Sequence, residues 1–252
     1  MKPGDIIPYG WDLSLIALSY LVSAVGSFIA LQCARGIPQG YGRVNHLALW
    51  ASSVAVGGGA IWYMHFIGMA AFVPPRVLSI RYDVLTTIAS MLAAIFVAAA
   101  GLFIVGRNPK NVVNLFVGGT IAGSGVAIMH YTGMGAMRMQ AIIEWDPTIV
   151  AVSVGIAIAA ATAALWLTFH TQHLIQRVAA ALVMAIAVCG MHYTGMYAGT
   201  YVCVAESAAT HSSLSIGGSV FPYLVAIVGA SLLTAVSILD ALALPEPNPA
   251  WG

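Results

Sequence analysis

Seven apolar stretches, each long enough to cross a lipid bilayer, dominate this chain of 252 residues. A helix needs about 20 apolar residues to span the hydrocarbon core, and backbone groups in lipid must be hydrogen-bonded within their own segment, which favours helices. The predicted fold is therefore all-α, a polytopic membrane protein with seven transmembrane helices. The expected spans are residues 13–33, 46–71, 83–106, 112–137, 148–169, 177–201 and 219–242.

Composition excludes several other classes of protein. Only 7% of the residues are charged and 60% are hydrophobic, whereas a soluble domain carries about 25% charged residues. The net charge of +1 argues against a nucleic-acid partner and leaves membrane lipid as the surroundings. The three cysteines, Cys33, Cys189 and Cys203, lack the spacing of a zinc motif or a disulfide framework.

A six-residue motif recurs near the end of every second apolar stretch. Its copies are Met64–Met69, Met129–Met134 and Met191–Met196, and their histidines are 65 and then 62 residues apart. The chain is therefore expected to contain three helical-hairpin repeats plus a seventh helix. Each second helix runs in the same direction, so the motifs should lie at one depth and meet on a pseudo-threefold axis.

The motif offers soft metal ligands. Each histidine shares a helix face with the methionine four residues later, and the leading methionine lies about 100° around the helix. Imidazole suits zinc, copper, iron and nickel, and thioethers select Cu(I), so copper is the predicted cofactor. The candidate ligands are His65, His130, His192, Met69, Met134, Met196, Met64, Met129 and Met191. Further candidates are Met137 and, in the third repeat, Cys189.

The loops predict an orientation. Five basic residues fall on one side and four on the other, with most acidic residues on the second side. This weak positive-inside bias predicts an outer N-terminus, a cytoplasmic C-terminus and motifs near the outer face. Residues 1–244 form the expected membrane domain, and the proline-rich residues 245–252 are expected to be a cytoplasmic tail or linker.

The motif triplet resembles the MHYT family of bacterial integral membrane sensors; Met129–Thr132 and Met191–Thr194 match its name literally, whereas Phe66 and Ile67 depart from it. The resemblance implies a copper-binding domain of the bacterial inner membrane that senses a diatomic gas (O₂, CO or NO) or a redox signal. It implies a cytoplasmic signalling domain, in cis or in trans, of the kind that makes or degrades cyclic di-GMP or acts as a histidine kinase. It also suggests a homodimer.

Other functions stay open at this point. Copper transport or homeostasis is the main alternative, although no charged residue lies in the middle of a span, which argues against ion conduction. A haem or di-metal oxidase is a third hypothesis, since haem can take two axial histidines. A retinal protein is excluded because Lys2 and Lys110 are the only lysines and neither lies in the seventh span. No catalytic domain is recognisable, so the chain itself is not expected to be an enzyme.

Overall fold

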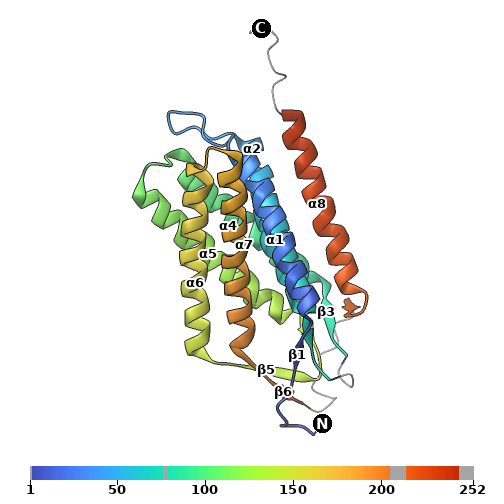
Figure 1. The fold of residues 1–252 in the computed structure, drawn as a ribbon. Helices are drawn as coiled ribbons and strands as arrows, with labels where there is room; N and C mark the ends of the chain where they lie inside the picture. The colour runs from blue at the N-terminus through green and yellow to red at the C-terminus, as the bar shows by residue number, and fades with distance from the viewer. Residues whose placement is uncertain (1, 76–78, 205–213, 244–252) are drawn as a thin grey trace.

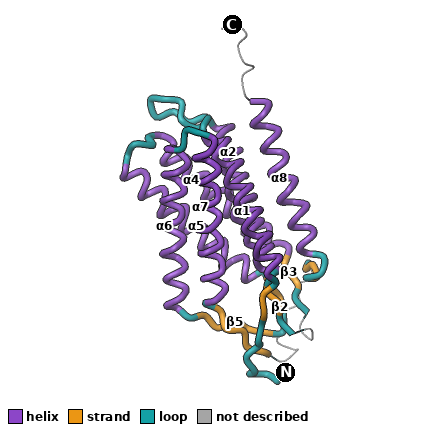
Figure 2. The backbone as a smooth tube through the Cα atoms, viewed as in Figure 1, coloured by secondary structure: helices purple, strands orange, loops and turns teal. Residues whose placement is uncertain are grey.

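The computed structural model describes residues 2–75, 79–204 and 214–243, and the predicted proline-rich tail lies outside these ranges. Seven helices within them are long and apolar enough to cross a membrane, which confirms the all-α, polytopic fold (Figures 1 and 2). The helices are α1 (Leu13–Ala34), α2 (His46–Ser53), the π-helix η1 (Val54–Tyr63), α3 (Met64–Ala70), α4 (Val84–Arg107), α5 (Val112–Gly135), α6 (Pro147–His170), α7 (Leu174–Tyr197) and α8 (Phe221–Ala243). The second span consists of α2, η1 and α3 in direct succession.

Each of the three hairpins begins with an aspartate that caps its first helix. The carboxylates of Asp12, Asp83 and Asp146 accept hydrogen bonds from backbone N–H groups in the first turns of α1, α4 and α6, which satisfies donors that have no partner within the helix. The backbone N–H of each aspartate also donates to the carbonyl of the alanine that ends the second helix of its own hairpin. These acceptors are Ala71, Ala136 and Ala198, at 2.9, 2.8 and 2.9 Å. One repeated bond therefore closes every hairpin at the motif end.

Short antiparallel ribbons extend the hairpins beyond the helices at the same end (Figure 2). The pairs are β1 (Gly10–Trp11) with β2 (Phe72–Val73), β3 (Arg81–Asp83) with β4 (Met137–Arg138), and β5 (Ala141–Trp145) with β6 (Gly199–Cys203), while β7 (Ser215–Gly217) joins β3. The sequence predicted none of these ribbons. It extended the sixth span to residue 201, but α7 ends at Tyr197 because residues 199–203 pair with β5 instead.

The first motif-bearing span contains one more residue than its two equivalents. Its helical stretch covers 25 residues, against 24 for α5 and 24 for α7. A π-helix arises when a residue is inserted into an α-helix, and η1 occupies the middle of this span. The insertion is thereby absorbed before Met64, so His65 keeps the level of the other two motif histidines.

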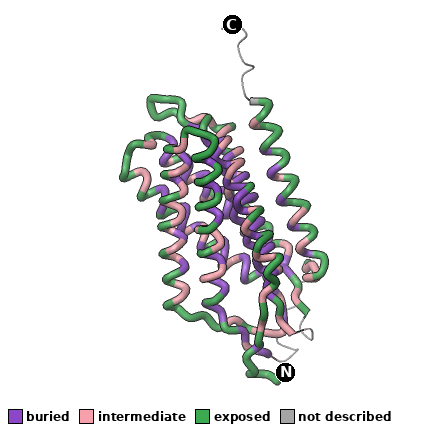
Figure 3. Tube along the Cα trace, in the orientation of Figure 1, coloured by how far each residue is buried: buried purple, intermediate pink, exposed green. Residues whose placement is uncertain are grey.

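The same span is the most deeply buried of the seven. In its most apolar window 67% of the residues are buried, whereas the values for the other spans are 17–44% (Figure 3). It packs against α1 at Gly26, where an added Cβ would lie 2.6 Å from the backbone nitrogen of Ala60. On another face it meets α8, where Gly229 lies against the ring of Tyr63. Glycine allows such close helix approaches in membranes because it has no side chain.

Replacement of Gly26 by alanine is expected to destabilise the bundle by about 1–3 kcal/mol, the usual cost of overpacking, because the new methyl group meets backbone atoms that cannot rotate away. Thermal unfolding in detergent measures the effect. Gly155→Ala is the matched control, since a Cβ at Gly155 in α6 has nothing within 4 Å. Equal melting temperatures for the two variants would contradict the close approach of α1 and η1.

Candidate metal centre

The three motif histidines meet in the interior of the bundle. The distances between their Nδ1 atoms are 3.0 Å from His65 to His192, 3.2 Å from His130 to His65 and 3.3 Å from His192 to His130. The ring planes cross at 78–89°, so each pair of rings is nearly perpendicular. Each side chain is at most 1% exposed. The convergence expected from the repeat is therefore present in the fold.

The size of this triangle suits a metal ion. A point equidistant from the three Nδ1 atoms lies about 1.8 Å from each, close to the roughly 2.0–2.1 Å of a zinc–imidazole bond. Among the described residues, these histidines are the only group of three or more His, Cys, Asp or Glu side chains that could hold a metal. Cys189, a sequence-based candidate, is not in the group.

The three facing nitrogens need a shared proton or a cation between them. Each Nδ1 carries either one hydrogen or one lone pair. With no proton in the triangle, three lone pairs face one another, and with two or three protons, N–H groups face one another. A single shared proton or a single cation at the centre relieves the repulsion. Buried groups of like polarity are costly without such compensation, so the residues present fit a bound metal.

The glycine of each motif makes room for a histidine of another repeat. A Cβ at Gly133 would clash with Nε2 of His65, one at Gly195 with Nε2 of His130, and one at Gly68 with Nε2 of His192. The contacts thus run in a cycle through all three repeats. Within the described part of the chain, these Nε2 atoms are buried and have no hydrogen-bond partner.

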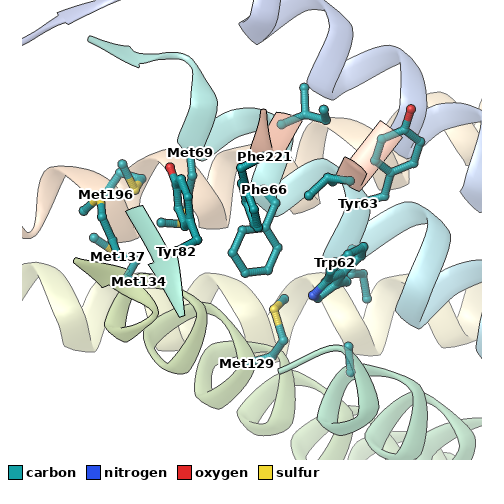
Figure 4. Packing of buried hydrophobic residues seen from close by; sticks show 14 of the residues in the cluster. Trp62, Tyr63, Phe66, Met69, Tyr82, Met129, Met134, Met137, Met196 and Phe221 are labelled. Carbon is teal, nitrogen blue, oxygen red and sulfur yellow. The ribbon is translucent and has the colours of Figure 1, made fainter. Parts of the chain in front are cut away.

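The methionines surround the histidines without exposure to the surface. The three at the i+4 positions, Met69, Met134 and Met196, are at most 1% exposed and belong to one hydrophobic cluster with Met137. Figure 4 shows Met134, Met137 and Met196 gathered at one end of this cluster. A helix rises about 6 Å over four residues, so these thioethers occupy the layer next to the imidazoles, toward the ribbons.

The first methionine of each motif does not have the same surroundings in all three repeats. Met129 lies in the same cluster, on the side of Trp62 in Figure 4. Met191 packs instead with Ala127 and Ala157, and Met64 is 1% exposed. Their roles as ligands, like those of the histidines and the other methionines, stay predictions.

The motif tyrosines connect neighbouring hairpins by hydrogen bonds. The hydroxyl of Tyr193 is 2.9 Å from Ser19 Oγ in α1, and that of Tyr131 is 2.6 Å from Ser153 Oγ in α6. The hydrogen bonds of these hydroxyls therefore go to serines and not to the motif histidines. The equivalent residue of the first repeat is Phe66, which has no hydroxyl.

The serines are site residues that the sequence analysis missed. Ser19, Ser90 and Ser153 each follow a capping aspartate by seven residues and are 0% exposed. Each also donates to a backbone carbonyl three residues earlier, at 2.7, 2.7 and 2.8 Å. The recurring Asp-x₆-Ser spacing was the available signal. It marks the inner face of the first helix in every repeat.

In the first repeat an aromatic contact replaces the tyrosine–serine bond. The ring of Phe66 lies 5.3 Å from that of Phe221 at the start of α8, and Phe221 stacks on Tyr82 at 3.9 Å between ring centroids. Burial raises the pKa of the Tyr82 phenol, so this ring stays neutral in its apolar surroundings. The motif helix of the first repeat is thus joined to α8.

The chain is similar to a known family of bacterial signalling proteins. The MHYT family, described as "Bacterial signalling protein N terminal repeat", matches residues 58–118 and 123–181. Each matched segment begins just before a motif. No solved structure matches the chain.

Curated relatives cover most of this chain. The bifunctional diguanylate cyclase/cyclic di-GMP phosphodiesterase MucR of Pseudomonas aeruginosa is 35% identical over 90% of this chain and 34% of its own length. The cyclic di-GMP phosphodiesterase NbdA of the same species is 33% identical over 73% of this chain and 24% of its own. The signaling protein YkoW of Bacillus subtilis is 33% identical over 76% and 24%. The chain therefore spans about a quarter to a third of the length of these relatives.

Substitution of Gly133 by alanine is expected to weaken metal binding about 10–100-fold, the range typical of groups that orient metal-ligating histidines, because the new methyl group displaces His65. Competition with a chromogenic Cu(I) chelator measures the affinity. Gly135→Ala, two residues away in α5, is the control, since a Cβ there has nothing within 4 Å. Unchanged affinity in Gly133→Ala would show that His65 is not a ligand.

Proposed function

The chain belongs to the MHYT family of bacterial membrane signalling proteins, and on that basis we propose that it is a copper-containing sensor of a diatomic gas or a redox signal. The 252 residues comprise the membrane sensor region and no catalytic domain. The enzymatic parts named in the descriptions of its relatives lie outside the matched region. The proposal therefore concerns detection of the signal, with the output made elsewhere.

The triangle of Nδ1 atoms is the observation that carries this proposal. Three imidazoles that converge in a buried interior create a site for one cation with three nitrogen ligands. Nearby thioethers favour Cu(I) over harder ions, and no carboxylate belongs to the group of described residues. A copper ion held in this way would supply an open coordination position and a one-electron redox couple.

A small apolar cavity supports a gas as the ligand. It has a volume of about 60 Å³ and is lined by Ile61 and Val126, which precede His65 and His130 by one helical turn. Two hydroxyl groups also line it, but both donate to backbone carbonyls: Ser52 to Ala30 and Thr168 to Ala164. Apolar cavities of this kind stay dry and take up apolar guests. The cavity would hold a molecule such as O₂, CO or NO about one helical turn from the histidines.

The contact between Phe66 and Phe221 supports a route for the signal. A change in ligation at His65 would move the next residue, Phe66, against the first turn of α8. Because α8 is the last described helix of the chain, its displacement would reach a cytoplasmic output domain in cis or in trans. By analogy with the relatives, that output would be the synthesis or degradation of cyclic di-GMP.

Copper transport is the alternative function. The methionines at the outer end under the proposed orientation, including Met137 and Met139, are suitable for capturing Cu(I). Beyond the histidines, however, the small cavity is lined almost wholly by apolar side chains. An ion would have no ligands there, which favours a sensor over a transporter.

Purified protein is expected to contain about one copper ion per chain, because three imidazole ligands fill one trigonal site. Elemental mass spectrometry measures the content, and the variant with His65, His130 and His192 all changed to alanine should contain none. Absence of copper from wild-type protein after reconstitution with Cu(I) would overturn the metal hypothesis. Copper uptake into proteoliposomes that depends on the same histidines would favour transport.

Filling the apolar cavity is expected to weaken gas binding without loss of the metal. Ala161→Leu places a larger side chain in the cavity lining and should lower the affinity of the Cu(I) form for CO about tenfold, which is ~1.4 kcal/mol. Infrared spectroscopy of bound CO measures it. Ala163→Leu is the control, because Ala163 is exposed on the same helix. Equal CO affinities would exclude the cavity as the gas site.

A further inference from the structure

A long apolar groove follows the seam between α1 and α8. It encloses about 580 Å³ and is lined by Leu21, Val25 and Ile29 on α1 and by Leu233 and Ile238 on α8, among others. Leu21 and Val25 on α1 and Ile238 on α8 are each more than half exposed. The groove lies within the membrane-spanning parts of both helices. Its surroundings are therefore the acyl chains of the bilayer.

A second cavity of about 320 Å³ continues the seam at the end of α1 opposite the histidines, and polar groups line it. They include the carboxylate of Asp240, the guanidinium of Arg35 and the amide of Gln32, with the thiol of Cys33 beside Asp240. No ion pair joins Arg35 to Asp240, both of which the structure describes. The Oε1 atom of Gln32 is buried without a hydrogen-bond partner among the described residues.

The two cavities share one face of α1. Residues 21, 25 and 29 of the groove and 32 and 36 of the polar cavity recur every three or four positions, so they form a single stripe along the helix and its end. In Figure 1, α8 diverges from α1 toward this end of the bundle. The stripe therefore connects the apolar groove within the membrane to the polar cavity at the membrane surface.

We propose that this seam binds one phospholipid whose headgroup carries a primary ammonium group. One acyl chain occupies the groove between α1 and α8, and the headgroup occupies the polar cavity. Arg35 binds the phosphate, since a guanidinium matches phosphate oxygens. Asp240 and the unpartnered Oε1 of Gln32 accept hydrogen bonds from the ammonium group, which has three N–H donors and no acceptor.

The charges of the cavity select this headgroup over an anionic one. A phosphate with an uncharged glycerol headgroup would use Arg35 but would leave Asp240 without a cation. A free phosphate ion would use Arg35 alone and would leave the apolar groove unfilled. Only a molecule with a phosphate, an ammonium group and a long apolar chain complements all three parts of the seam.

Native mass spectrometry of the full chain tests the proposal. The protein is released from nanodiscs that contain equal amounts of phosphatidylethanolamine and phosphatidylglycerol, and the retained lipid is counted. We expect one phosphatidylethanolamine per chain. Val25→Trp, which fills the groove, should lower its retention about tenfold, and Leu18→Trp should not, since Leu18 is exposed on the same helix but lines neither cavity.

A second pair of variants tests the headgroup. Asp240→Asn should abolish the preference for phosphatidylethanolamine over phosphatidylglycerol, whereas Glu144→Gln, the same chemical change at the other end of the spans, should preserve it. Equal retention of the two lipids by wild-type protein would overturn the proposal, as would full retention by Val25→Trp. Because Asp240→Asn changes neither size nor packing, the headgroup test remains decisive even where Val25→Trp fails to fold.

Discussion

Three imidazole nitrogens that face one another within 3.3 Å, in the buried interior of the bundle, impose the strictest condition on this structure. Their mutual repulsion must be relieved by a cation or a shared proton, and their rings must be held where solvent cannot reorient them. The surrounding architecture meets this condition. Glycines leave space for the outer ring nitrogens, and hydrogen bonds and ribbons close each hairpin beside the site.

Repetition explains how one site is built from distant segments. Each repeat supplies a capping aspartate, a buried serine and a histidine, and each histidine rests on a glycine from another repeat. The cycle of contacts means that no hairpin can build the site alone. Displacement of any motif helix therefore moves a ring on its neighbour, which is a useful property in a detector.

The first repeat differs from the other two in three features. It has Phe66 in place of tyrosine, it contains the π-helix Val54–Tyr63, and its motif helix contacts α8. In place of a tyrosine–serine bond, its interface with α4 has a hydrogen bond from Trp62 Nε1 to the backbone carbonyl of Thr87, at 3.2 Å. Among the described motif helices, that of the first repeat is positioned against the helix that leads toward the C-terminus.

The sequence by itself determined the seven spans, the three hairpins and the convergence of His65, His130 and His192, because helices of equal length and direction bring equivalent positions to one level. Only the tertiary structure decided features that depend on contacts between distant segments. Residues 199–203 pair with β5 and so shorten the sixth helix, and Ser19 and Ser153 become the partners of the motif tyrosines through the packing of the hairpins. Spacing along the chain defines which side chains share a helix face, but only the packed bundle determines what each face meets.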